Sequence, residues 1–164
     1  MDKRLMAMLA LQLAAAALSP LSRAESQERR DVGTYVMGDA AVRVTAAAPR
    51  VEMLVVQSPA TMMLYLDGRS TLAWADSAEQ ILRLKRDDVP YGHTEVETTV
   101  LRHPDHSYSN GVLLTRVFRD KRTHCYLTTW VGRNSYTAIE MSDKQARSVV
   151  AALKRAAMEV GGGR

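Results

Sequence analysis

The last part of the chain carries one apolar stripe at helical spacing. The residues of the stripe are Ala146, Val149, Val150, Leu153, Ala156, Ala157 and Val160, and their spacing places them on one face of an α-helix. Arg147, Lys154 and Arg155 lie on the opposite face. Just before the stripe, Ser142 and Gln145 have the spacing of a capping box, which begins a helix. Because a helix with one apolar face must be packed against another element, the chain before it should supply a sheet.

Four segments with strand character precede this helix. They span residues 94–102, 112–119, 123–131 and 135–141, with turn residues such as Asn110-Gly111 and Gly132-Arg133-Asn134 between them. Strands at this spacing, joined by short turns, predict an antiparallel meander. The meander is the expected partner of the terminal helix.

The N-terminal half also reads as strands, followed by a short helix. Strands are predicted at residues 34–37, 41–45, 51–57 and 61–66. Asp67-Gly68 predicts a hairpin into a return strand at 71–75, because glycine accepts a positive φ. A capping box at Asp76–Glu79 then predicts a short helix that ends near Asp87-Asp88.

Together these elements predict an α+β fold: N-terminal strands and a four-strand meander form antiparallel sheet, packed by a short central helix and a long C-terminal amphipathic helix. Residues 33–160 form the domain, residues 25–32 a flexible leader and residues 161–164 a disordered tail. The element order resembles in outline that of small exported domains of the PsbP type, some of which serve as immunity proteins. The resemblance implies an exported protein that binds another protein.

Residues 1–24 have the pattern of a secretory signal peptide. Lys3 and Arg4 give a basic start, residues 5–18 are apolar apart from Gln12, and small residues precede a cleavage site after Ala24. The alternative is an uncleaved membrane anchor, but the apolar run is shorter than the roughly 20 residues that a spanning helix needs. We therefore expect a periplasmic or secreted protein without stable membrane insertion.

The net charge of the chain bears on the kind of partner to expect. The formal net charge of +4 includes Lys3, Arg4, Arg23 and Asp2, so removal of the signal segment leaves +2. This balance gives no reason to expect nucleic acid as a partner.

Cys125 is the single cysteine, so it cannot form an internal disulfide, and its strand-like surroundings predict a buried, inert thiol.

No motif in the chain predicts catalysis, a metal site or a cofactor. The nucleophile elbow of serine hydrolases and the glycine-rich phosphate loop are both absent. His103, Asp105 and His106, with His93 upstream, could ligate a metal, but Pro-Asp is ordinary turn chemistry. Glu95 and Glu97 share a strand face, as alternate strand residues do, and are expected to face solvent. We therefore expect a non-enzymatic protein.

Aromatic residues predict the binding surface. Alternation along residues 123–131 places Tyr126 and Trp130 opposite Cys125 and Leu127, and Tyr136 extends that face. The face is either covered by other elements or open to a partner. The predicted partner-binding residues are Tyr126, Trp130 and Tyr136, the loop residues His103, Asp105 and His106, and the rim residues Arg116 and Arg133.

The function predicted from these features is an exported inhibitor, immunity-type or envelope accessory protein that acts by protein–protein contact, possible partners being a toxin or a hydrolase. The alternative is a carrier of a small apolar ligand, with a pocket between sheet and helices. The residues expected to line that pocket are Met62, Leu64, Met141 and Met158. An uncharacterised hydrolase is a third possibility.

Overall fold

The computed structural model describes residues 29–102, 110–119 and 122–161. A four-stranded antiparallel sheet comes first, in the order β1 (Arg29–Met37), β2 (Ala40–Ala47), β3 (Arg50–Gln57) and β4 (Ala60–Asp67). A five-stranded antiparallel sheet follows, with the order β5 (Glu95–Glu97), β7 (Asn110–Arg119), β8 (Arg122–Val131) and β9 (Ser135–Met141), and with β6 (Leu101–Arg102) also paired to β7. Helix α2 (Gly68–Arg83) and the short 3-10 helix η1 (Arg86–Asp88) separate the sheets, and α3 (Asp143–Gly161) ends the described chain. The predicted α+β class is confirmed.

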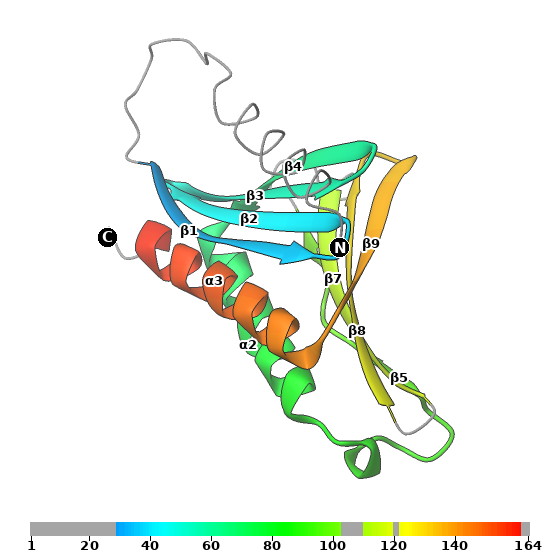
Figure 1. Ribbon diagram of the computed structural model, residues 1–164. Coiled ribbons are helices and arrows are strands. Elements are labelled where there is room, and N and C mark those ends of the chain that lie inside the picture. Colours follow the sequence, from blue (N-terminus) through cyan, green and yellow to red (C-terminus); the bar gives the residue numbers. More distant parts are fainter. Residues whose placement is uncertain (1–28, 103–109, 120–121, 162–164) are drawn as a thin grey trace.

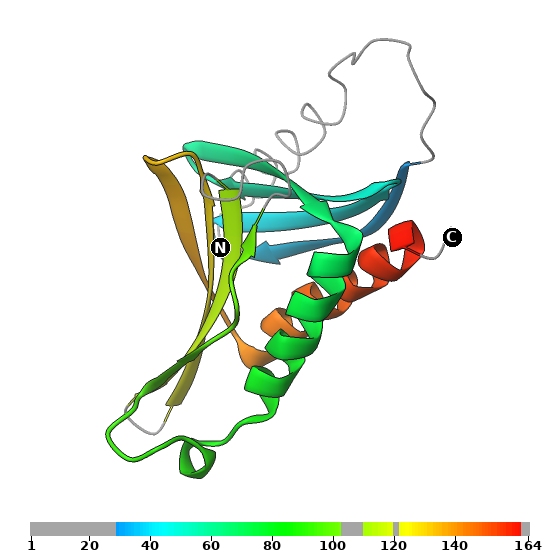
Figure 2. The same cartoon turned by 180° about the vertical axis from the view of Figure 1, so that it is seen from behind.

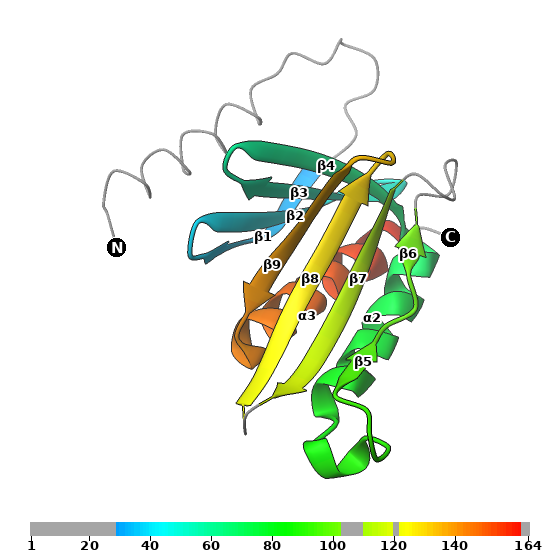
Figure 3. The ribbon, with the colours of Figure 1, turned by 90° about the vertical axis from the view of Figure 1, so that its right-hand side faces the viewer.

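The two sheets stand at an angle to each other, and both helices lie in that angle (Figure 1). Seen from behind, α2 runs beside α3 in the opposite direction (Figure 2). Lys154 of α3 fixes this pairing, because its Nζ lies 2.8 Å from Asp76 Oδ1 and 2.9 Å from Glu79 Oε2 of α2. Viewed from the side, the five-stranded sheet turns its other face away from the helices (Figure 3).

The core fills the angle between the sheets. Both sheets contribute fully buried side chains from their inner faces, such as Val44, Leu64 and Leu127, and α3 contributes Leu153. The apolar stripe predicted for the terminal helix is buried almost completely, from Ala146 to Ala157. Its capping box is present as well, since Ser142 Oγ accepts the Gln145 amide hydrogen and Gln145 Oε1 accepts that of Ser142.

Residues 67–75 differ from the prediction. Asp67-Gly68 is not a hairpin and 71–75 is not a strand, because Asp67 caps α2: its Oδ2 accepts the Ser70 amide at 2.8 Å. The buried residues of α2 have helical spacing instead: Thr71, Trp74, Ala75, Ala78, Ile81 and Leu82. The capping box predicted at Asp76–Glu79 is therefore wrong too, and both carboxylates bind Lys154 from inside the helix.

The segment predicted as one strand at 94–102 is divided into β5 and β6. Between β5 and β6 the backbone ladder to β7 is interrupted at Thr98. There the side-chain Oγ1 of Thr98, in place of a backbone carbonyl, accepts the hydrogen bond from the Leu114 amide at 3.1 Å. Its own amide donates to the Leu114 carbonyl at 3.0 Å. A side-chain acceptor in place of a carbonyl shifts the strand locally. At the N-terminal end, β1 begins at Arg29, within the segment expected to be a flexible leader.

Candidate functional site: the outer face of the five-stranded sheet

The five-stranded sheet has one buried face and one open face. Along β8, Cys125, Leu127 and Thr129 are buried against the helices, whereas the alternate residues from His124 to Trp130 are half-buried. Tyr126 and Trp130 thus lie opposite Cys125 and Leu127, as predicted. Within the part of the chain that the structure describes, no element covers the outer face (Figure 3).

One end of the outer face is aromatic. Gly111, Trp130 and Tyr136 are cross-strand neighbours on β7, β8 and β9. The Trp130 ring lies over Gly111 so closely that a Cβ added there would be 2.1 Å from Trp130 Cζ2. Tyr136 is 75% exposed. An aromatic pair with an open ring face supplies rigid contact area of the kind that anchors protein interfaces.

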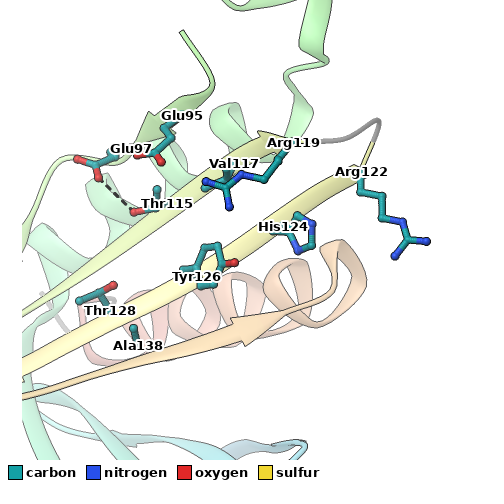
Figure 4. A pocket seen from close by; sticks show the side chains of 10 residues that line it. All are labelled: Glu95, Glu97, Thr115, Val117, Arg119, Arg122, His124, Tyr126, Thr128 and Ala138. Carbon is teal, nitrogen blue, oxygen red and sulfur yellow. Dashed lines mark hydrogen bonds between the residues drawn. The ribbon is translucent and has the colours of Figure 1, made fainter.

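The other end of this face is a trough of about 700 Å³ (Figure 4). One row across it is Glu97, Thr115 and Tyr126, one residue from each of β5, β7 and β8 in register, and Glu140 of β9 continues the row beside the trough. Glu97 accepts a hydrogen bond from the Thr115 hydroxyl at 3.3 Å. His124 Nδ1 lies 2.6 Å from Glu140 Oε1, and the His124 ring stacks against Tyr126 with centroids 6.5 Å apart.

The trough presents charges of both signs. Glu95 and Glu97 line its β5 side, and Arg119 and Arg122 lie at the paired ends of β7 and β8. Glu140 of β9 lies beside the trough, where it pairs with Tyr126. All five side chains belong to exposed residues. Such a surface can form hydrogen bonds and rim ion pairs with a protein partner, and these set orientation and association rate.

Sequence reasoning missed His124, Glu140 and the Arg119–Arg122 end as parts of this surface. The signal was available for Glu140, because alternation along residues 135–141 places it on the same side as Tyr136. The in-register pairing of β8 with β9 that brings His124 to Glu140 required the structure.

The predicted rim residues lie in different places. Arg133 is exposed in the turn between β8 and β9, close in sequence to Trp130 and Tyr136. Arg116 does not lie at the rim: it is buried on the inner face, where Nη1 donates to the Ile81 carbonyl at 3.1 Å and Nη2 to Asp143 Oδ2 at 2.7 Å. His103, Asp105 and His106 lie outside the described residues.

Cys125 is buried, as predicted, and its thiol donates a hydrogen bond to Asp143 Oδ1 at 3.3 Å. Burial raises the pKa of the Cys125 thiol to about 12, and the hydrogen bond to Asp143 acts in the same direction. A thiol that stays protonated is a poor nucleophile, so this side chain has a packing role.

The four residues expected to line a ligand pocket do not share one. Met62 lines a surface groove together with Met63 and Tyr136. Met62, Leu64 and Met141 are buried in the packed core, whereas Met158 is half exposed on the surface of α3.

Over residues 29–102, 110–119 and 122–161, no group of three His, Cys, Asp or Glu side chains is arranged to hold a metal ion. The helices among these residues do not combine the length and apolar character needed to cross a bilayer.

Comparison with known proteins adds little. No protein-family model matches the chain, and no curated protein sequence matches it. Among solved structures, the plant transcriptional regulator PBF-2 is similar over 88% of this chain and 85% of its own, at 10% sequence identity and a TM-score of 0.45. A likeness at this level establishes neither a shared fold nor a shared function.

Proposed function

We propose that the protein is an exported, non-enzymatic binding protein that acts by contact with another protein of the cell envelope, as an inhibitor, immunity-type or accessory protein. The observation that carries the proposal is the open outer face of the five-stranded sheet. This face combines the Trp130–Tyr136 pair with a polar trough, and no described element packs on it.

The shape of this face favours a protein over a small ligand. A small-molecule site buries most of its ligand in a concave, largely apolar cavity. Here an aromatic area and a shallow, charged trough lie side by side on one sheet, as the centre and rim of a protein interface do. Export is supported by the basic start, apolar run and small residues of positions 1–24.

Alanine variants compared within one captured complex test the proposal. The protein carries a C-terminal tag, is cross-linked to its partner in the envelope of its own host, and is then purified. The captured partner is identified, and its affinity for each variant is measured by titration. We expect Trp130→Ala and Tyr136→Ala to weaken binding about 30-fold or more, because central aromatic residues dominate interface energies.

Tyr91→Ala is the matched control, since Tyr91 is fully exposed in the segment before β5 and does not belong to the outer face. Equal affinities for Trp130→Ala, Tyr136→Ala and the control would contradict the proposed interface. Export is tested by mass analysis of the protein recovered from the envelope fraction, which should begin at Glu25.

A further inference from the structure

A second surface lies on α3, away from the outer face of the five-stranded sheet (Figure 1). It is a groove of about 490 Å³ where α3 passes the edge strand β1. The groove is lined by Tyr35 of β1 and by Lys144, Arg147, Ser148, Ala151 and Arg155 of α3. The α3 residues recur at intervals of three, one, three and four, so they form one continuous strip along the helix.

The strip is cationic. Three of the six residues that line the groove are Lys or Arg, all of them in the α3 strip, and none is Asp or Glu. Within the described residues, neither Lys144 nor Arg155 forms an ion pair, whereas their neighbour Lys154 contacts two carboxylates of α2. Arg147 donates one Nη2 hydrogen to the Leu82 carbonyl, which leaves its remaining N–H groups for a ligand.

The lengthwise spacing of the cations indicates the form of the ligand. Lys144 and Arg155 are about 16 Å apart along the helix axis, at ~1.5 Å per residue. One phosphate group cannot reach both ends of such a strip, but an extended polypeptide covers it with about five residues, at ~3.3 Å each. Alternate residues of an extended chain point the same way, so carboxylates at every second position would all face the cations.

The floor of the groove fits a polypeptide as well. The Tyr35 ring and the Ala151 methyl group lie among the cations, and Ser148 adds a hydroxyl oxygen beyond the bond its hydrogen makes to the Lys144 carbonyl. We infer that this groove binds an extended acidic segment of a partner protein. The inference goes beyond the proposed function and uses none of the residues of the outer sheet face.

Binding is measured by fluorescence anisotropy at low ionic strength with the mature protein. The probe is a fluorescein-labelled decapeptide in which Glu alternates with Ala, and matched Gln-Ala and Lys-Ala decapeptides are compared with it. We expect saturable binding of the Glu-Ala peptide only. The double variant Lys144→Gln/Arg155→Gln should weaken that binding at least ~10-fold, and added salt should weaken it further.

Lys85→Gln/Arg86→Gln, which also removes one Lys and one Arg charge, from exposed residues outside the groove, should change affinity less than ~2-fold. Circular dichroism confirms that each variant folds. Absence of binding by the Glu-Ala peptide, equal binding by the Gln-Ala peptide, or equal losses in Lys85→Gln/Arg86→Gln would each overturn the inference. So would tighter binding, sensitive to the double variant, of inorganic phosphate, phosphatidylglycerol vesicles or a single-stranded oligonucleotide.

Trp130→Ala separates this inference from the proposed function. It should leave binding of the Glu-Ala peptide unchanged, because Trp130 lies on the outer face of the five-stranded sheet and not in the groove. Loss of peptide binding in Trp130→Ala would show that the peptide occupies the other surface and would overturn the assignment to α3.

Discussion

Arg116 of β7 and Asp143 of α3 form an ion pair, with Nη2 and Oδ2 2.7 Å apart. The same guanidinium donates from Nη1 to the Ile81 carbonyl at 3.1 Å and to the Leu84 carbonyl. One side chain therefore joins the end of α2, the start of α3 and the inner face of the five-stranded sheet. This arrangement holds both helices against the sheet whose opposite face is the proposed interface.

Arg116→Met should lower the free energy of unfolding by about 2–4 kcal/mol, because it leaves two carbonyls and a partly buried carboxylate without their donor. Urea unfolding followed by circular dichroism measures the change. Arg119→Met, an exposed position on the same strand, is the control and should change stability by less than ~0.5 kcal/mol. Similar values for the two variants would show that the Arg116 contacts do not stabilise the fold.

The Cys125 thiol should resist alkylation in the folded protein. Burial raises its pKa to about 12, so almost no thiolate is present at pH 9, whereas an unfolded thiol ionises near pH ~8.5. Mass spectrometry after iodoacetamide treatment at pH 9 should find labelling only when urea is added. Rapid labelling without urea would contradict the buried placement.

The raised pKa of Cys125 also predicts a stability change at high pH. The stability gained from the neutral thiol is fully present below the unfolded pKa and is lost as pH rises toward the folded value of about 12. From pH ~8.5 upward, unfolding free energy should therefore fall more steeply in the natural protein than in Cys125→Ala. Parallel curves for the two proteins would contradict this prediction.

Asp67→Ala should destabilise the protein by about 1 kcal/mol at pH 7, because the Ser70 amide loses its cap. Asn caps helices as well as Asp does, so Asp67→Asn should cost less. The hydrogen bond from the Ser70 amide lowers the pKa of Asp67 from its ordinary value, so the ionised cap stabilises the fold above the unfolded-state pKa. This contribution is lost as pH falls through the lower folded-state pKa. Urea titrations should show that Asp67→Asn lacks this part of the acid sensitivity; equal losses in acid would contradict it.

Gly111→Ala should displace the Trp130 ring, because the new methyl carbon would lie 2.1 Å from Cζ2. The indole N–H resonance of Trp130 should shift in a ¹⁵N correlation spectrum, while that of buried Trp74 stays in place and serves as an internal reference. Binding to the captured partner should weaken as well. An unmoved Trp130 resonance would show that the ring does not rest on Gly111.

Much of the fold was predictable because its signals are local. The Ser142–Gln145 cap and the stripe that follows it specify α3, and alternation specifies β7 to β9. The prediction for residues 67–75 was wrong for a local reason too, because Asp-Gly is compatible both with a hairpin and with the start of a helix. The buried positions Thr71, Trp74 and Ala78 are spaced as on one face of a helix. This spacing favours a helix over the hairpin that Asp-Gly alone suggests.

The candidate site was predictable only in part. Alternation alone placed Tyr126 and Trp130 on one face, since a strand's side chains point to opposite faces regardless of context. Arg116 obeys the same rule, and its pairing with Cys125 puts it on the inner face. From the sequence alone, a charged residue at such a position is predicted to be exposed to solvent. The partners that allow Arg116 to be buried, Ile81 and Asp143, are distant along the chain and cannot be recognised from local sequence.

By itself the sequence determined the identity of most strands, the terminal helix and its buried stripe, because hydrophobic period and capping act over a few residues. Tertiary structure decided that the strands form two sheets, that the helices fill the angle between them, and that one face of the second sheet stays open. Those outcomes depend on contacts such as Arg116–Asp143 and Lys154–Glu79 between distant residues. Local spacing carries no information about which distant partners will meet.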